Sequence, residues 1–313
     1  MSTSVRVGTE STAPLGGRRE TLISRIARQT GRMGLLFPAV ALMAVFLVGP
    51  IAYSVYGSLT NAALSGYKAA NPEFVGLENY AELLTSNAFW KAVLLTVIFV
   101  FASAVIGQNI LGLALAMLMR KAPKILSTLV GGVVVIAWVM PEIVAAFALY
   151  AFFSTDGTLN VLLSYIGLGG TTWLLTFPMF SVIMANIWRG TAFSMMVYSA
   201  ALAEVPPEIQ EAAKVDGARR WQRFFFVTLP MIKGSISTNL LLTTLQTLGV
   251  FTLLWVMTGG GPGTQSTTLP VMAYQEAFKN SLIGYGTAIA TVTIVLGALF
   301  ALVYIRALKP EVD

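Results

Sequence analysis

The sequence predicts an all-α membrane protein with six transmembrane helices, both termini in the cytoplasm, and a cytoplasmic helix between the fourth and fifth spans. Of its 313 residues, 56% are hydrophobic and 11% are charged, whereas a typical soluble domain has about 25% charged residues. So few charges cannot cover a water-facing surface of this size. Apolar runs long enough to cross a hydrocarbon core of about 30 Å recur along the chain. Lipid is therefore the solvent that explains the composition.

The chain contains no cysteine and no histidine. This excludes thiol nucleophiles, disulfides, imidazole bases and the usual zinc and haem ligands. We therefore expect no catalytic residue and no metal site. The formal charge of +6 does not indicate nucleic acid, because the basic residues lie next to apolar spans, where such residues set orientation in the membrane.

Residues 1–32 are predicted to form a cytoplasmic tail. The first 20 residues are polar and have the composition of a disordered segment. Residues 20–32 form a short basic amphipathic stretch, which either lies on an anionic membrane surface or only fixes the orientation of the first span. Its basic and apolar residues are Arg25, Arg28, Arg32, Leu22, Ile23 and Ile26.

The six spans follow in order, and the topology can be tested by counting lysines and arginines. The predicted spans are residues 33–59, 91–119, 125–153, 174–199, 231–257 and 284–306. With the N-terminus inside, 16 of the 20 lysines and arginines are cytoplasmic and three are outside. The positive-inside rule then places both termini, including the short tail 307–313, in the cytoplasm.

Two of the outer loops carry signals of their own. Residues 60–90 combine a proline and a glycine with several aromatic side chains, which predicts a short folded piece on the membrane surface. The run from Thr258 to Thr264 is too rich in glycine to continue a helix and predicts a sharp break.

The loop of residues 200–230 has the densest charge in the chain and is predicted to face the cytoplasm. Pro206 and Pro207 suit the first turn of a helix, and Gly217 suits a helix end that needs positive φ. The pattern predicts a short helix, a tight turn at Asp216-Gly217 and a second helix that runs into Pro230. Its small alanines and flanking charges indicate a docking surface for another protein, although a solvated loop with a buried alanine face has the same pattern.

This loop resembles the motif of ABC importer permeases, in which Glu-Ala-Ala precedes a glycine and then Ile-x-Leu-Pro. Here the motif is Glu211-Ala212-Ala213, Gly217 and Val227-Thr228-Leu229-Pro230, with Val227 replacing the usual isoleucine. The resemblance implies a coupling helix that fits a groove on a separate ATPase dimer, which would itself bind ATP and Mg²⁺. The chain would then be a transport subunit without a cofactor of its own. The docking residues implied are Glu204, Pro207, Glu208, Glu211, Ala212, Ala213, Asp216, Gly217 and Ala218.

Three further segments are similar to the maltose-type sugar permeases. In that group two permeases work as partners, and the resemblance is to the partner with the longer N-terminal part. They are residues 74–80, residues 157–160 and residues 258–263, the last with Leu269-Pro270 and residues 274–278. The resemblance covers residues 33–306, which we take as the permease domain. It implies a multi-pass protein of the bacterial plasma (inner) membrane. It also implies a second permease subunit and an extracytoplasmic binding protein that delivers a mono-, di- or oligosaccharide.

Charged side chains inside the membrane are costly, so they are functional candidates. Glu142, directly after Pro141 in the third predicted span, is the clearest case. It could hydrogen-bond sugar hydroxyls, be protonated, or pair with the partner permease. Arg189 lies in the fourth span, nearer the cytoplasm by chain direction, so a direct pair between the two is not secure.

Asn239, Thr243 and Gln246 are spaced at i, i+4 and i+7 in the fifth span and are predicted to share one helix face. Such a stripe either lines a sugar path or joins helices to one another. Trp188 could stack on a sugar ring or anchor the chain at the membrane interface.

Two other functions remain open on the sequence. One is an importer permease of the same superfamily for amino acids, phosphate, glycerol phosphate or glycerophosphodiesters. The other is a membrane-embedded enzyme, which would need catalytic groups at membrane depth, where only Glu142 and Arg189 are charged. ATP hydrolysis by the chain itself is not expected, because the glycines at 259–263 lack the Lys-Ser/Thr of a phosphate-binding loop.

Overall fold

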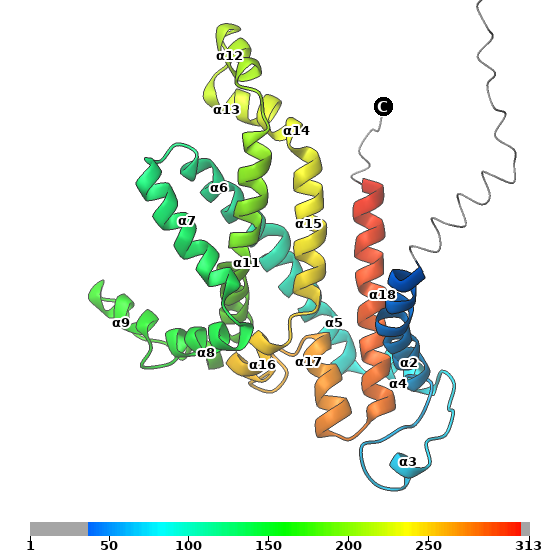
Figure 1. Ribbon diagram of the computed structural model, residues 1–313. Coiled ribbons are helices and arrows are strands. Elements are labelled where there is room, and N and C mark those ends of the chain that lie inside the picture. Colours follow the sequence, from blue (N-terminus) through cyan, green and yellow to red (C-terminus); the bar gives the residue numbers. More distant parts are fainter. Residues whose placement is uncertain (1–36, 308–313) are drawn as a thin grey trace, which may run out of the picture. The chain divides into compact units, whose positions relative to one another are not determined.

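The computed structural model describes residues 37–307, which are helical apart from turns and one isolated β-bridge between Thr60 and Phe74 (Figure 1). The predicted tail 1–32, with its basic stretch, and residues 308–313 lie outside the described residues. The chain divides into two units at Tyr53 and Ser54. Residues 54–307 are the described part of the second unit, which we call the body.

The first predicted span is a helix of 21 residues, Phe37–Gly57, which contains η1 (Ala44–Val48) and α2 (Gly49–Gly57). Its length matches the roughly 20 residues that a bilayer core requires.

Residues 58–86 form the short folded piece that the aromatic loop predicted, with α3 (Tyr67–Ala70) and α4 (Glu78–Thr85). The buried Asn79 amide donates to the carbonyl oxygens of Ser58 at 2.8 Å and Thr60 at 2.9 Å. One side chain thus joins the start of α4 to the residues that directly follow α2.

The second span is one continuous helical run from Asn87 to Met119, made of α5 (Asn87–Phe99), the π-helical η2 (Val100–Gln108) and α6 (Asn109–Met119). Ser86 caps it by accepting a hydrogen bond from the Phe89 N–H.

The third span was predicted as one helix over 125–153, and this is wrong. The chain forms α7 (Lys124–Val139) and α8 (Glu142–Phe153), separated by extended residues Met140 and Pro141. Pro141 lacks an N–H and disfavours the helical conformation of the residue before it. A further helix, α9 (Thr158–Tyr165), follows α8.

The fourth span is α11 (Pro178–Ala203), a helix of 26 residues that follows the short α10 (Trp173–Thr176). It packs against η2, α6, α7 and α15, so it is the centre of the body. Figure 1 shows α11 and α15 running side by side toward α12.

The fifth span was also predicted as one helix, over 231–257, and this too is wrong. It consists of α15 (Lys233–Leu248) and α16 (Thr252–Thr258), and the chain leaves helical geometry at Gly249 to Phe251. The predicted glycine break follows, with positive φ at Gly259 and Gly260. The last described elements are α17 (Leu269–Tyr274), η4 (Gln275–Lys279) and α18 (Ile283–Ala307).

By length and apolar composition, four helices between residues 37 and 307 can cross a membrane, or five if one bent pair counts as a span. The four are Phe37–Gly57, Asn87–Met119, Glu142–Tyr165 and Ile283–Arg306. Although α11 is long enough, it is not among them, because it carries polar residues along its length. The helical membrane fold is therefore confirmed, and the number six stays a prediction.

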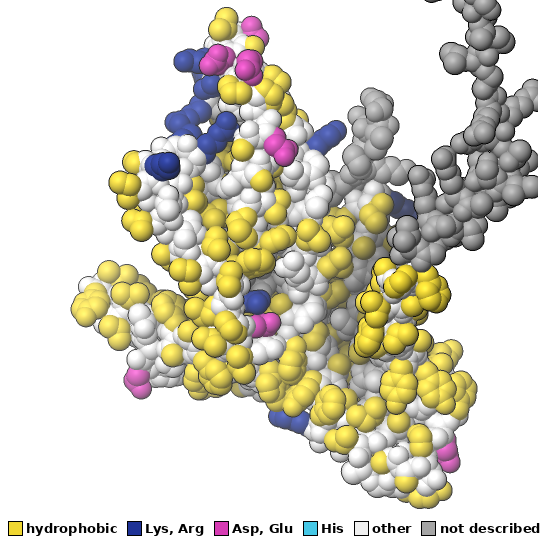
Figure 2. Space-filling model, in the orientation of Figure 1, with side chains coloured by type: hydrophobic (Ala, Val, Ile, Leu, Met, Phe, Trp, Pro, Cys, Tyr) yellow, Lys and Arg dark blue, Asp and Glu magenta, His cyan; other side chains and the backbone are white. Residues whose placement is uncertain are grey.

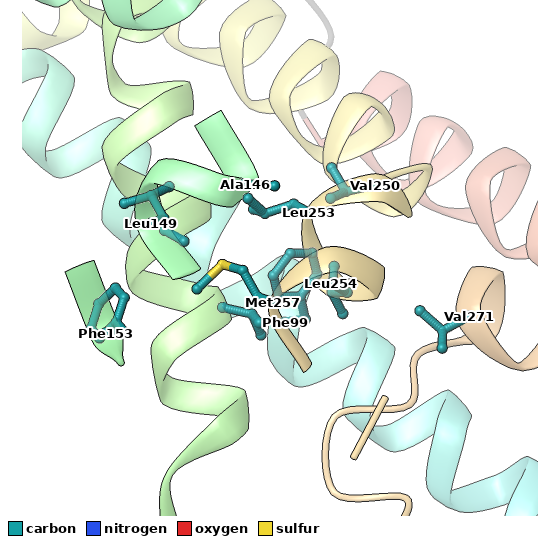
Figure 3. Packing of buried hydrophobic residues seen from close by; sticks show 11 residues of the cluster. Phe99, Ala146, Leu149, Phe153, Val250, Leu253, Leu254, Met257 and Val271 are labelled. Atoms are coloured by element: carbon teal, nitrogen blue, oxygen red, sulfur yellow. The ribbon is translucent and has the colours of Figure 1, made fainter. Parts of the chain in front are cut away.

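The main apolar cluster joins α5, α8, α11 and α16 around the two helix breaks. Figure 3 shows Phe99, Leu254 and Met257 pointing toward one another at its centre. The cluster packs against both α8 and α16. This packing stabilises the breaks that separate α8 from α7 and α16 from α15.

Candidate functional site

The loop between α11 and α15 has the predicted order of helix, turn and helix. The first helix is α12 (Pro207–Val215), Gly217 has a φ of 80°, and α13 (Arg220–Arg223), η3 (Phe224–Thr228) and α14 (Leu229–Met231) follow. The Gly217 N–H donates to Lys214 and the Ala218 N–H to Ala213, which closes the helix end. Glycine is required here because other residues rarely adopt this φ.

The α12–α13 hairpin, residues 207–223, presents an open surface. Of the nine predicted docking residues, Ala213 and Ala218 are half-buried and the other seven are exposed: Glu204, Pro207, Glu208, Glu211, Ala212, Asp216 and Gly217. Val215 is 86% exposed. Within residues 37–307 the alanine face is exposed at Ala212 and half-buried at Ala213, whereas the solvated-loop interpretation expects a buried face. Figure 2 shows basic and acidic side chains gathered at this end of the body.

The hairpin is attached to the body at its base. Gln210 of α12 donates to the Thr228 hydroxyl of η3 at 3.0 Å. Val205, just before α12, is buried with Leu202 and Ile232. A force on α12 therefore reaches both α11 and the start of α15.

A cluster of buried polar side chains surrounds Asn109, at the junction of η2 and α6. Its amide donates to the Ala104 carbonyl at 2.7 Å and to the Thr243 hydroxyl at 3.4 Å. Its carbonyl oxygen accepts from Asn239 at 2.8 Å and from the Tyr198 hydroxyl. Asn109 thus joins α6 to both α11 and α15.

A second cluster surrounds Asn186 of α11. Its amide donates to the Ser103 hydroxyl at 2.8 Å and to the Thr247 hydroxyl at 3.3 Å. Its backbone carbonyl accepts from Gln108 at 3.1 Å. We call the two clusters together the amide network. Such contacts join membrane helices, at about 0.6 kcal/mol each.

The predicted stripe on α15 is divided between two environments. Asn239 and Thr243 are buried in the amide network, whereas Gln246 is exposed. Thr247, one residue further on, is the buried member. Trp188 of α11 is also exposed, at 45%.

Glu142 and Arg189 form the charged pair of the body. One Arg189 Nη lies 3.9 Å from the Glu142 carboxylate, whose other oxygen accepts from the Leu253 N–H at 3.2 Å. The opposite chain directions of the third and fourth predicted spans had placed Arg189 nearer the cytoplasm than Glu142. The break at Met140-Pro141 places Glu142 at the start of α8, beside α11 and the first turn of α16. Both side chains remain about a quarter exposed, and the buried Arg189 Nε has no acceptor within residues 37–307.

Sequence reasoning missed Asn109, Asn186 and Tyr198. Asparagines within apolar runs are as informative as the charges that were singled out, because unpaired amides are also costly in lipid. That signal alone would have marked the first two residues but not their partners.

Residues 108–313 match the family described as binding-protein-dependent transport system inner membrane component. The chain belongs to this family. The match begins at Gln108 and includes the amide network residues of α6, α11 and α15, the charged pair and the whole α12–α13 hairpin.

Full-length relatives agree with this assignment. The chain is 31% identical to the trehalose/maltose transport system permease protein MalF of Thermococcus litoralis, over 91% of this chain and 96% of that protein. It is 33% identical to the sulfoquinovosyl glycerol transport system permease protein SmoG of Agrobacterium fabrum, over 88% and 90% of the two chains. It is also 33% identical to the trehalose transport system permease protein SugA of Mycobacterium tuberculosis, over 90% of each. The predicted resemblance to maltose-type permeases is thus confirmed.

The fold is also that of solved transporters. A chain of a bacterial ABC transporter involved in importing the acidic polysaccharide alginate has a TM-score of 0.76 and 23% identity, covering 93% of this chain and 99% of that one. A chain of an amino acid ABC transporter has a TM-score of 0.51 and covers 74% of this chain. The permease fold is therefore shared, and more completely with the first of the two.

Proposed function

We propose that this chain is a permease subunit of an ATP-driven importer that moves a sugar across the plasma (inner) membrane. Family membership and the sugar permeases among the full-length relatives support this proposal. An external binding protein would deliver the sugar, a second permease would complete the path, and a separate ATPase dimer would bind ATP and Mg²⁺. The path would open alternately to the two sides as the ATPase changes state.

The orientation that we propose has six spans with both termini in the cytoplasm. The distribution of lysines and arginines supports it. The spans outside the four counted by apolar composition are α11 and α15, and α15 is counted only together with the bent segment of residues 220–231. Their polar side chains form the amide network, so these helices have few unpaired polar groups to expose to lipid.

The observation that carries the proposal is the α12–α13 hairpin. It is anchored at its base through Gln210 and Val205, yet its charged residues and Val215 are exposed among residues 37–307. A fixed helix with an open surface suits docking into a groove of a partner. We assign the nine docking residues predicted above to contact with the ATPase.

For the sugar path we propose the side of the body that exposes polar and aromatic groups at membrane depth. Glu142, Trp188 and Gln246 have exposed surface, so they suit hydrogen bonding and stacking with a sugar. Asn239 and Thr243 are enclosed and would support the path from behind by holding α15 to α6. Permeases for amino acids or glycerophosphodiesters remain the alternatives, and substrate competition would separate them from a sugar permease.

Co-purification in detergent from the native host tests the docking assignment. The variants are Glu211→Arg, which reverses a charge on α12, and Gly217→Pro, which cannot adopt a φ of 80°. The matched control is Glu78→Arg, the same reversal on an exposed residue of the outer α4. Retained partners are identified by mass spectrometry.

We expect an ATPase and a second permease to be retained by the wild type and by Glu78→Arg. The ATPase should be lost from both hairpin variants, while the second permease stays. If crosslinking retains no ATPase with the wild type, or if the hairpin variants retain it fully, α12 is not the docking element.

A further inference from the structure

A pocket of about 250 Å³ lies at the base of the α12–α13 hairpin, below the proposed ATPase contact. We call it the basic pocket, because two segments far apart in the sequence contribute cations to it. Arg120 and Lys121 directly follow α6, and Arg220 and Arg223 belong to α13. Gln210 and Thr228 also line it, so the hydrogen bond that anchors α12 forms part of its wall.

The basic pocket contains positive charge without a counter-charge. None of its lining residues is acidic, and no carboxylate of residues 37–307 lies within ion-pair distance of the four cations. The Arg223 Nε is buried and has no hydrogen-bond acceptor among these residues. Gathering four like charges is unfavourable, and an unsatisfied buried donor adds to the cost. A bound anion would relieve both.

The rest of the wall is apolar. Met117, Leu202 and Phe224 line the pocket, and the neighbouring Trp221, Phe225 and Phe226 are 54%, 55% and 70% exposed. A free inorganic anion would use the cations and leave these aromatic side chains uncovered. A ligand with both a phosphate and hydrocarbon would use both surfaces.

The geometry of the following helix indicates where that ligand comes from. Residues 220–231 are inclined by 69° to α15. If α15 crosses the membrane, this segment lies close to the membrane plane. A helix with arginines and exposed aromatic side chains in that position is typical of the interface between headgroups and acyl chains.

We propose that the basic pocket binds the phosphate headgroup of an anionic phospholipid from the cytoplasmic leaflet, with an acyl chain beside Phe224, Phe225 and Phe226. The arginines supply the charge-assisted hydrogen bonds that a phosphate diester accepts, and an anionic leaflet surface attracts such clusters by about 1 kcal/mol per cation. The inference rests on the orientation proposed above. Its consequence is that a lipid contacts the residues that attach α12 to the body.

Native mass spectrometry of the full chain with its co-purified partners tests this proposal. The complex is exchanged into detergent with either phosphatidylglycerol or phosphatidylcholine, and retained lipid is counted. The test variant is Arg220→Gln/Arg223→Gln, and Arg120→Gln/Lys121→Gln changes the same pocket from α6. The matched control is Lys124→Gln/Lys233→Gln, which removes two exposed lysines at the start of α7 and α15, outside the pocket.

We expect the wild type and the control to retain phosphatidylglycerol and not phosphatidylcholine. Retention should fall by about tenfold or more in both pocket variants, since each loses two cations. Millimolar glycerol 3-phosphate should not displace the lipid, because it lacks acyl chains. Displacement by it would instead identify the pocket as a site for soluble phosphates and overturn the lipid assignment.

Equal lipid retention in all variants overturns the proposal. So does a pocket variant that keeps the lipid but loses the ATPase, because the cations would then bind carboxylates of the ATPase. Failure of the docking assignment has a separate signature. In that case no sample retains an ATPase, while lipid is still lost only from the pocket variants.

Discussion

The amide network and the charged pair lie in the same helical body, but their polar groups are satisfied to different degrees. Asn109 uses both its donor and acceptor groups on three neighbouring elements and is almost fully buried. Glu142 and Arg189 are separated by 3.9 Å, and their side chains are 29% and 26% exposed. The Arg189 Nε has no acceptor within residues 37–307.

This difference separates two uses of polar residues in a membrane. The groups of the amide network are bonded within the chain, except for the buried Asn239 Oδ1, which has no donor among residues 37–307, so the network mainly holds helices together. In the charged pair, the long distance between the two side chains and their exposed surface leave hydrogen-bonding capacity for another molecule. The predictions below change one region at a time, from the largest expected effect to the smallest.

Gly112→Val should have the largest effect, because it separates the helices that carry the amide network. A Cβ at Gly112 would lie 2.4 Å from the Ser194 Cβ and 2.9 Å from the Met195 backbone nitrogen. Backbone cannot move aside cheaply, so we expect a loss of about 3 kcal/mol or more. Thermal unfolding in detergent, followed by size-exclusion chromatography, measures it. Gly132→Val is the control, since nothing lies within 4 Å of its Cβ, and an equal loss there would exclude close helix approach as the cause.

Asn109→Leu should lower stability by about 2 kcal/mol. It removes several interhelical contacts of about 0.6 kcal/mol each and leaves the amide of Asn239 and the hydroxyl of Tyr198 without their shared acceptor. The same unfolding assay measures the change. A stability equal to that of the wild type would mean that the amide network does not join the helices.

Glu142→Gln should change stability by less than about 1 kcal/mol, because the charged pair is partly exposed and long, and the amide oxygen can still accept from Leu253. Transport in vesicles should nevertheless fall several-fold, because Arg189 is left without its counter-charge. Glu78→Gln, at an exposed position of α4, is the control. The reverse pattern, a large loss of stability with normal transport, would assign the charged pair to structure.

The double variant Glu142→Gln/Arg189→Gln sharpens this test. If the two side chains act as a unit, the second substitution should restore part of the transport that the first removes, which a double-mutant cycle quantifies. Additive losses would indicate that each side chain contacts the substrate or another partner separately.

Gln246→Leu should have the smallest effect on stability, within about 0.5 kcal/mol, because the side chain is exposed and outside the amide network. Comparison with Asn109→Leu isolates burial, since both substitutions replace an amide by leucine. A loss as large as that of Asn109→Leu would remove the distinction between the two regions. A selective change in transport would support the proposed sugar path.

The sequence predicted best where the signal is local. The turn at Gly217 was predictable because it depends on the backbone conformation of that residue alone. The order of helix and turn in residues 207–223 follows from the prolines, the charges and that glycine. The long apolar runs behave similarly, since the helices over 37–57, 87–119 and 283–307 agree with the predicted spans to within a few residues.

The two broken spans depend on contacts across the fold. Pro141 was a usable signal that a helix ends before it, although the apolar run continued past it. Gly249 is a weak signal by itself. The N–H of Leu253, in the first turn of α16, is bonded to the Glu142 carboxylate from another span, and no pattern within residues 231–257 contains that information.

The α15 stripe failed for a related reason. Successive helical residues turn by about 100°, which places Gln246 nearer to Asn239 around the helix than Thr247. The structure buries Thr247 because Asn186 of α11 lies on that side. Periodicity defines a face, but the neighbouring helices decide how far around the helix it extends. The basic pocket was missed in the same way, since Arg120 and Arg220 lie far apart in the sequence and no local pattern brings them together.

The chain bends at Ile232, between residues 220–231 and α15, so α15 can tilt about its hairpin end. Asn239 is about 10 Å from the bend and Thr247 about 22 Å, at 1.5 Å per residue. A tilt of about 10° would therefore move Thr247 about 4 Å and Asn239 only about 2 Å. Hydrogen bonds near 3 Å are lost well before a displacement of about 2 Å, and as a tilt grows Thr247 reaches that limit before Asn239 does. A movement of the hairpin would therefore break the hydrogen bonds around Asn186 before those around Asn109.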